Sequence, residues 1–357
     1  MLVRDFIDDS LYNPHYGYFS KKAYIFSPED IHFNEIRDEY AFQNHVSDLY
    51  REIDGELDDR NDLSRQVWHT PTELFKPYYG YAIANRIVTE HRQTNTNNPS
   101  APLTIYEIGA GNGTLMLNIL DYIKQHASDL YPHTQFNIIE ISGKLAERQS
   151  ERQDFRQASH RHEKVAIINK SIFEWDELVE EPCFFVAMEV IDNFSHDLIR
   201  YSHTTTPPTP VQAIVLTDED GEYTEAYEPI TDPLLNRYLH TRSLTPYPPK
   251  LLSPRLQTLQ KLRTYLPLAP NLSPPEYLPT MCFRLFEKLR DKFPRHRLII
   301  SDFSELTETV EGIDAPVVQT RYKGTMVPCS TYLVQPGWFD IFFPTDFEVM
   351  KAVYEVV

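Results

Sequence analysis

Three of this chain's eleven glycines lie within five residues, at Gly109, Gly111 and Gly113. An apolar run over 103–108 precedes them, and a run with helical spacing over 115–123 follows, so the segment predicts a strand, a tight turn and a helix. Glycine accepts positive φ at little cost and leaves the backbone bare, so a ligand can lie directly against such a turn. The segment is therefore the first candidate for a binding site.

The spacing of these glycines narrows the kind of ligand. The dinucleotide fingerprint G-x-G-x-x-G would need its third glycine at Thr114, and no Lys-Ser or Lys-Thr pair follows to make a P-loop. The pattern is E-x-G-x-G-x-G, and a second apolar run, 136–139, ends in an acid suited to bonding a ribose diol. Both features resemble class I methyltransferases that use S-adenosylmethionine (SAM). The predicted cofactor-binding residues are Glu107, Gly109, Gly111, Gly113 and Glu140. A turn that only packs a helix on a strand, and a nicotinamide or flavin site, are the alternatives.

A second group of polar side chains follows the apolar run 183–188. Glu189 ends that run, and Asp192 and His196 come shortly after it. SAM is an activated donor, so the protein must chiefly hold the acceptor in line by positioning and electrostatics. If the acceptor is a guanidinium, whose pKa is about 13.8, carboxylates suit the task because bidentate contacts fix its plane and localise its charge. Glu189 and Asp192 are the candidate catalytic acids, and His196 is a candidate general base or hydrogen-bonding partner. The alternative is that Asp192 caps the next helix and Glu189 only positions SAM.

Composition argues against several other classes of protein. The net charge is −18, which disfavours nucleic acid as a partner and fits a basic protein, although acidity also serves solubility alone. The pair His160-x-His162 has no third ligand nearby, so no metal site is predicted. No apolar run reaches the roughly 18–20 residues of a membrane span, and the acidic segment 1–39 does not look like a basic presequence.

The order of the patterns predicts the elements that position these residues. Residues 1–98 form an aromatic and acidic region with helical stretches. Residues 99–228 alternate strands and helices, which predicts an α/β fold with a Rossmann-like, doubly wound and mostly parallel sheet, followed by a hairpin turn at Asp220-Gly221. A proline-rich insertion with helices, 229–296, precedes final strands and a helix, 297–357, that complete the core. Ligands of such sheets bind beyond the carboxyl ends of the strands, where the glycine turn and the acids would meet.

Several segments together resemble the MidA-like family of SAM-dependent methyltransferases. The family's E-x-G-P-G-x-G-T-L motif matches residues 107–115, with Ala110 in place of proline. Its N-E-F-F-D-A-L-P element corresponds to residues 188–195, where both acids are kept and Asn193-Phe194-Ser195 departs from the pattern, as in a divergent branch. Other family elements match along nearly the whole chain, at 14–19, 70–75, 300–303, 324–326 and 337–341.

This resemblance implies a function and a compartment. The family includes a mitochondrial protein arginine methyltransferase that assists assembly of respiratory complex I. It therefore implies SAM as methyl donor, symmetric (type II-like) dimethylation of arginine in a complex I subunit, and a mitochondrial location. The cytoplasm is the alternative, because no presequence is visible. Two other functions stay open, namely methylation of a small molecule and a catalytically silent assembly factor that keeps the SAM fold as a platform. The intact glycines and acids argue against the silent platform.

Overall fold

A five-stranded parallel sheet forms the centre of the computed structural model, which describes residues 1–357 except 22, 30, 56–65, 99, 152–161, 163–164, 204, 206–207, 249–270, 307–314 and 323. The strands are β3 (Leu103–Ile108), β4 (Thr134–Ile139), β5 (Val165–Ile168), β6 (Cys183–Met188) and β11 (His296–Ser301). They run in the order β11-β6-β3-β4-β5, and every neighbouring pair is parallel. The predicted α/β class and parallel sheet are confirmed, and the strand from the C-terminal segment joins the core as expected.

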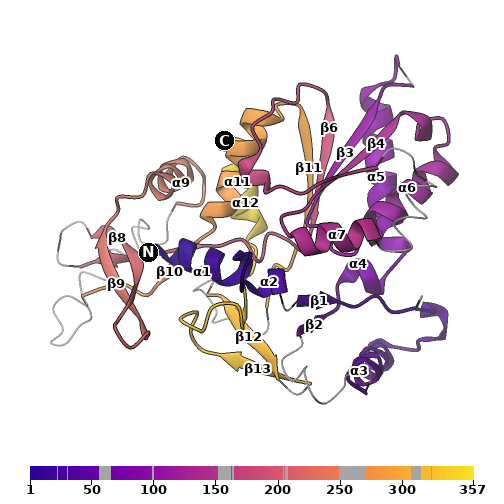
Figure 1. The fold of residues 1–357 in the computed structure, drawn as a ribbon. Coiled ribbons are helices and arrows are strands. Elements are labelled where there is room, and N and C mark those ends of the chain that lie inside the picture. The colour runs from indigo at the N-terminus through magenta and orange to yellow at the C-terminus, as the bar shows by residue number, and fades with distance from the viewer. Residues whose placement is uncertain are drawn as a thin grey trace.

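Helices cover both faces of this sheet (Figure 1). They are α5 (Tyr78–Thr94), α6 (Thr114–His126), α11 (Thr280–Lys292) and α12 (Phe347–Val356). Successive side chains of a strand point to opposite faces. On one face, Ile105 and Phe184 join a buried cluster with α5 and α6. On the other face, Tyr106 and Phe185 join a cluster with α11 and α12. Because both faces are buried, apolar residues occur on both faces of these strands, and β6 is apolar throughout.

An antiparallel sheet stands beside the parallel one. Its strands are β7 (Asp197–Ser202), β8 (Thr209–Thr217), β9 (Tyr223–Pro229) and β10 (Glu276–Leu278), in the order β10-β7-β8-β9. The predicted hairpin is β8–β9, and Gly221 in its turn has a φ of +85°. β7 to β9 belong to the range predicted as parallel core, yet they leave that sheet. The reason is the connection after β6, which contains no crossover helix to carry the chain back parallel.

The N-terminal helix α1 (Val3–Tyr12) packs on this second sheet. Phe6 is buried in the contact, in the same cluster as Leu198 of β7. The buried guanidinium of Arg4 lies 2.5 Å from an Asp197 carboxylate oxygen and 3.0 Å from one of Asp232. Apolar packing and ion pairs therefore hold α1 to β7 and to Asp232, the N-cap of α9 (Pro233–Ser243).

The remaining helices and strands lie outside the two larger sheets. The helices are α2 (Tyr18–Lys21), α3 (Glu39–Gly55), α4 (Pro71–Leu74), α7 (Gly143–Glu151) and α9 (Pro233–Ser243), with 3-10 turns at Phe33–Glu35, Tyr131–His133 and Ile172–Glu174. The strands β1 (Ala23–Ile25) and β2 (Gln66–Trp68) form a parallel pair, and β13 (Thr325–Cys329), β12 (Val317–Tyr322) and β14 (Asp340–Phe342) form a third sheet. The division into four sequence regions stays a proposal.

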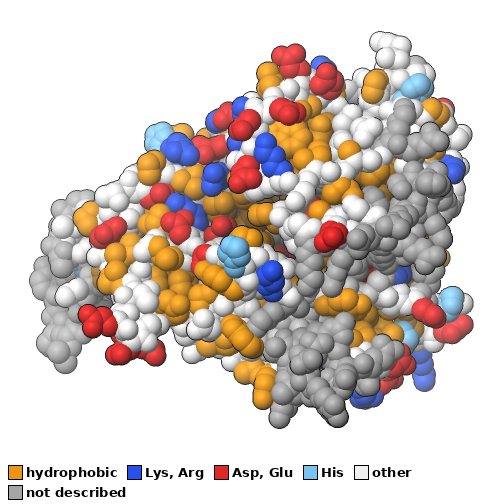
Figure 2. All heavy atoms as spheres, viewed as in Figure 1, with side chains coloured by type: hydrophobic (Ala, Val, Ile, Leu, Met, Phe, Trp, Pro, Cys, Tyr) orange, Lys and Arg blue, Asp and Glu red, His pale blue; other side chains and the backbone are white. Residues whose placement is uncertain are grey.

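Charge on the molecular surface is mixed in sign. On the face shown in Figure 2, blue Lys and Arg side chains lie among red Asp and Glu side chains, with apolar side chains between them. Within the described ranges, none of the helices is both long and apolar enough to cross a membrane.

Candidate active site

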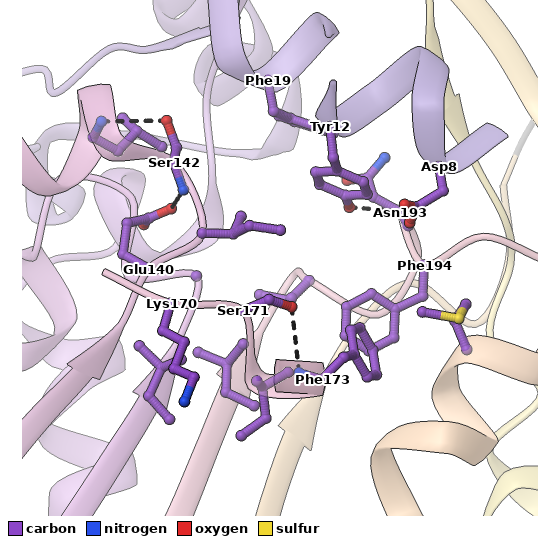
Figure 3. Close-up of a pocket in the computed structure, with 18 of the residues that line it drawn as sticks. Asp8, Tyr12, Phe19, Glu140, Ser142, Lys170, Ser171, Phe173, Asn193 and Phe194 are labelled. Carbon is purple, nitrogen blue, oxygen red and sulfur yellow. Dashed lines mark hydrogen bonds between the residues drawn. The ribbon is translucent and has the colours of Figure 1, made fainter. Parts of the chain in front are cut away.

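A cavity of about 390 Å³ lies at the carboxyl edge of the parallel sheet. The loops after β3, β4, β5 and β6 form part of its wall, and residues of α1, α2, β1, α7 and α11 supply the rest (Figure 3). Of the residues predicted from the sequence, Gly109, Gly111, Glu140 and Glu189 line it. They come together because the carboxyl ends of parallel strands share one edge of the sheet.

The glycine turn keeps bare backbone against this cavity. Gly109 has a φ of +68° and Gly111 a φ of +51°, in the left-handed region. A Cβ atom would lie 2.9 Å from Cγ2 of Val190 at the first position and 2.9 Å from Cδ1 of Ile25 at the second. Gly113 does not line the cavity and starts α6 instead, as its N-cap with a φ of +77°. The turn therefore has the form expected of a ligand cradle.

Side chains from distant segments hold the glycine turn in place. Asn112 donates a hydrogen bond from Nδ2 to Oε1 of Glu73 at 2.8 Å, and Thr114 donates from Oγ1 to the same oxygen at 2.8 Å. Gln149 donates from Nε2 to the carbonyl of Gly111 at 2.9 Å. The sequence-based prediction missed Glu73 and Gln149. The Thr-Pro start of α4, three residues before Glu73, is the local signal that could have located it.

Glu140 presents a carboxylate to the cavity from the end of β4. Its Oε1 accepts a hydrogen bond from the backbone N–H of Ser142 at 2.9 Å, and its Oε2 accepts one from Nε2 of Gln149 at 3.2 Å. Burial raises the pKa of Glu140, and the two hydrogen bonds lower it. Burial is the larger effect, so the pKa is about 7. Each carboxylate oxygen has a second lone pair, so Glu140 can still accept hydrogen bonds from a ligand diol.

Glu107 lies in β3 and does not line the cavity. Its Oε2 is buried without a hydrogen-bond partner among the described residues. Burial first, and then the nearby charge of Glu140, raise the pKa of Glu107 to about 8. The side chain is therefore mostly protonated at neutral pH, held under the glycine turn by the sheet.

Glu189 has an unusual backbone, and one oxygen of its side chain has no hydrogen-bond partner among the described residues. It is the one non-glycine with a positive φ (+55°) in the described part of the chain, a conformation that costs about 1–3 kcal/mol. Its N–H donates to the carbonyl of Ser301 at 2.8 Å, which ties the turn to β11. Oε1 is buried with no hydrogen-bond partner among the described residues, and burial with the charge of Asp302 raises the pKa of Glu189 to about 8. Backbone strain and an unsatisfied carboxylate on a cavity wall are typical of functional sites.

Asp192 lies behind this wall and does not line the cavity. Its Oδ1 accepts a hydrogen bond from the N–H of Asn193 at 2.8 Å, and its own N–H donates to Asp302 at 3.0 Å. Burial, followed by the charges of Asp302 and Asp340, raises the pKa of Asp192 well above its ordinary value. The structure thus differs from the prediction that Asp192 faces the acceptor. It does not cap a helix either, because a turn and then β7 follow it.

His196 also differs from its predicted place. Its Nδ1 is 2.8 Å from the carbonyl of Phe194, and its ring stacks on Phe343 with centroids 3.7 Å apart. It lines a separate cavity of about 240 Å³, not the one at the strand ends. The structure therefore supports a packing role for His196 and no contact with an acceptor.

No metal-binding group of three His, Cys, Asp or Glu side chains is found among the described residues. His162 is buried, with Nδ1 2.5 Å from the hydroxyl of Tyr131. His160, the other histidine of the His160-x-His162 pair, lies outside the described residues.

The sequence predicts that the terminal regions enclose the site, but it did not single out the residues of α1 that form the wall opposite Glu140. Figure 3 shows Asp8 and Tyr12 of α1 there, together with Asn193 and Phe194. Tyr12 donates from its hydroxyl to the carbonyl of Asn193 at 3.1 Å, which connects α1 to the loop after β6. No local pattern indicates that the first helix of the chain closes a site built on strands a hundred residues later.

Comparisons with known proteins agree with this geometry. A family model of S-adenosyl-L-methionine-dependent methyltransferases matches residues 82–357. A curated relative from Schizosaccharomyces pombe, named protein arginine methyltransferase NDUFAF7 homolog, mitochondrial, is 25% identical over 259 residues, which are 69% of this chain and 52% of the relative. The chain therefore spans about half the length of the curated relative that it matches.

Two solved structures from Burkholderia thailandensis have the same fold. One, described as a methyltransferase and crystallised with S-adenosylhomocysteine, matches with a TM-score of 0.58 and 15% identity over 100% of this chain and 72% of that chain. The other, a native structure of the same superfamily, matches with a TM-score of 0.56 and 14% identity over 99% of this chain and 70% of that one. The family model spans the glycine turn and the acids at the strand ends, so the chain belongs to the S-adenosyl-L-methionine-dependent methyltransferases, with SAM as its methyl donor.

Proposed function

We propose that this protein methylates arginine side chains of a protein substrate, forms symmetric dimethylarginine, and acts in mitochondria on a subunit of respiratory complex I. The observation that carries the proposal is the Glu189 carboxylate, which lines the cavity with one buried oxygen unpartnered among the described residues. A guanidinium N–H is a donor of the right geometry and charge for such an oxygen. The name of the fission yeast relative supports both the arginine substrate and the mitochondrial location.

SAM binds, in this proposal, along the glycine turn with its ribose on Glu140. Two observations fit such a ligand, the bare backbone where a Cβ at Gly109 or Gly111 would collide, and the carboxylate of Glu140 on the cavity wall. When bound, SAM supplies a methyl group that the acceptor nitrogen takes with its lone pair, while the carbon–sulfur electron pair stays on sulfur as S-adenosylhomocysteine and the nitrogen releases one proton. The chain's own part is to hold the acceptor and to receive that proton.

Glu189 performs both tasks in this proposal. A pKa of about 8 leaves Glu189 mostly protonated in the empty site at neutral pH, and the positive charge of an entering guanidinium favours its carboxylate form. That carboxylate accepts the guanidinium hydrogen bond, directs one nitrogen and receives the released proton. Asp192 keeps the turn after β6 in shape, because its carboxylate bonds Asn193 within that turn. His196 packs on Phe343 and takes no part in transfer.

The ribose contact gives a first test. Glu140→Ala should weaken S-adenosylhomocysteine binding by about 1.5–3 kcal/mol, roughly 10- to 150-fold, because charge-assisted hydrogen bonds are lost. Isothermal titration calorimetry measures this directly. Glu147→Ala, on the exposed side of α7, removes the same charge and should bind like the wild type. Equal affinity in Glu140→Ala and the wild type would show that the ribose lies elsewhere.

The buried carboxyl of Glu107 predicts a pH dependence of stability. Its pKa of about 8 in the folded chain exceeds the ordinary 4.5, so the folded state holds a proton that the unfolded state releases. The ligand-free protein should therefore lose stability as pH rises from about 4.5 to about 8, by an amount on the order of a few kcal/mol from this group. Urea unfolding at pH 5.5 and 8.5 should show a smaller loss in Glu107→Gln than in the wild type. The exposed variant Glu222→Gln should lose as much unfolding free energy between these two pH values as the wild type. An equally large loss in Glu107→Gln would disprove the role of Glu107 in the pH dependence.

The substrate is tested in cells and in extracts. Deleting the gene should deplete symmetric dimethylarginine on one respiratory subunit and lower the amount of assembled complex I, both measured by mass spectrometry. Extract from the deletion strain, incubated with the purified protein and tritiated SAM, should regain the label in that subunit. Label in a small-molecule fraction instead would establish a metabolite acceptor. No label in either fraction would establish the silent platform.

A further inference from the structure

The cavity at the strand ends is adjacent to a second one along α1. This second cavity, of about 340 Å³, is lined by residues of α1, α9 and α11 together with Asp232. Asp8, Met281 and Arg284 line both cavities, so the two meet at these three side chains. In Figure 3, Glu140, the proposed contact for the ribose of SAM, lies across the first cavity from Asp8. The junction is therefore on the side of the cavity that remains for the acceptor.

Two other basic side chains around the junction are already held by carboxylates. Arg4 pairs with Asp197 and Asp232, and Arg237 is held by Glu287 through two hydrogen bonds of 2.8 and 2.9 Å. Because Arg4 faces two carboxylates, the charge around it stays negative, which favours an incoming cation over an anion.

Asp8 is different from these pairs. Ser195 donates a long hydrogen bond of 3.3 Å from its Oγ to Oδ1 of Asp8, and Asp8 stays exposed on the cavity wall. Burial of part of the side chain raises its pKa, while the nearby positive charge of Arg284 lowers it. A carboxylate in this position gains most from a cationic donor that approaches through the cavity.

Aromatic side chains form the wall next to Asp8. The rings of Phe173 and Phe194 lie 5.6 Å apart, and the guanidinium of Arg284 stacks over Phe173 at 5.2 Å. Flat aromatic walls suit a planar guanidinium, because they stack on its faces while a carboxylate bonds its edge.

We propose that Asp8 is a specificity-determining residue that selects a cationic acceptor, and that the substrate's arginine side chain enters from the second cavity past Asp8, Met281 and Arg284. The inference rests on the proposed function, because it names the part of that same site which admits the arginine. Asp8 pairs with the entering guanidinium and guides it toward Glu189, whereas the like charge of Arg284 on the same path weakens binding of the guanidinium. The N-terminal helix is thus the substrate-reading part of the enzyme.

Asp8 can be changed without loss of the helix that carries it. α1 is anchored by its buried apolar side chains and by the ion pairs of Arg4. None of these contacts involves Asp8. Asp9, the next residue, bonds Asn13 and Tyr16 and does not line either cavity. Asp9→Asn therefore makes the same charge change in the same helix and serves as the matched control.

The experiment separates binding from turnover. A synthetic peptide with one central arginine is titrated against each variant saturated with S-adenosylhomocysteine, and its methylation with tritiated SAM is followed in parallel. Asp8→Asn should weaken peptide binding and raise KM at least tenfold, with S-adenosylhomocysteine affinity unchanged and kcat lowered less than threefold. Asp8→Glu should recover part of the affinity, and Asp9→Asn should match the wild type in every readout. Arg284→Gln should lower KM, because it removes a like charge.

The outcomes distinguish this inference from the proposed function. Wild-type affinity in Asp8→Asn, or a parallel loss of S-adenosylhomocysteine binding in that variant, overturns the role of Asp8. A wild-type protein that does not bind the arginine peptide overturns it as well. Peptide binding that depends on Asp8 without any methyl transfer overturns the proposed function and leaves the cation-selecting role standing. Loss of peptide binding in Arg284→Gln but not in Asp8→Asn would place the contact with the peptide on Arg284 and overturn the role of Asp8.

Discussion

Gly111→Val is expected to abolish binding of S-adenosylhomocysteine, with an affinity loss of at least 100-fold. Gly111 has a φ of +51°, a conformation that β-branched residues rarely adopt. Its Cβ would lie 2.9 Å from Cδ1 of Ile25, and the two valine methyl groups would extend into the space beside the turn. Ile25 could move aside at small cost, so the loss comes mainly from the altered turn and the filled cradle. Isothermal titration calorimetry gives the affinity, and circular dichroism confirms the fold.

Gly221→Val is the matched control for this variant. Gly221 also has a positive φ, +85°, but nothing lies within 4 Å of its Cβ position, in a turn that does not line the cavity. It carries the same kind of backbone strain without touching the site, so its affinity should equal that of the wild type. Unchanged affinity in Gly111→Val would disprove the cradle. Binding of NADH by the wild type would point to a dinucleotide instead.

Glu189→Gln is expected to lower kcat by about 100-fold or more while S-adenosylhomocysteine affinity stays within threefold of the wild type. Glutamine keeps the size of the side chain and meets the same strained φ of +55°, so the turn should persist. The amide cannot receive a proton and attracts a guanidinium less strongly, and a positioned proton acceptor typically contributes 10²–10⁴-fold to a rate. Single-turnover methylation of the arginine peptide measures the transfer step.

Glu180→Gln, at an exposed position outside the cavity, removes the same charge and should leave kcat unchanged. If Glu189→Gln lost both transfer and cofactor binding, the residue would belong to the cofactor site. If Asp192→Asn lost transfer and Glu189→Gln did not, the role predicted for Asp192 from the sequence would stand, despite its position behind the cavity wall.

Local patterns were sufficient to predict the parallel sheet and the cofactor side of the cavity. The strand, glycine turn and helix around Gly109 depend on residues close together in the chain, namely an apolar run, a need for positive φ and helical spacing. Glu140 follows directly from the end of β4, and the carboxyl ends of neighbouring parallel strands share an edge of the sheet. These relations need no knowledge of distant contacts.

Only the tertiary structure decided which acids reach the acceptor side. Glu189 and Asp192 are three residues apart, but the left-handed backbone at Glu189 leaves one carboxylate on the cavity wall and the other among Asp302 and Asp340. Asp8 precedes Ser195 by 187 positions, and α1 brings them together through packing on the second sheet. A side chain's direction after a strand depends on the turn that follows, and its partners depend on long-range packing. Neither is encoded in a pattern of neighbouring residues, which is why the sequence alone determined the glycine turn and the acid after β4, and the fold determined which side chains face them across the cavity.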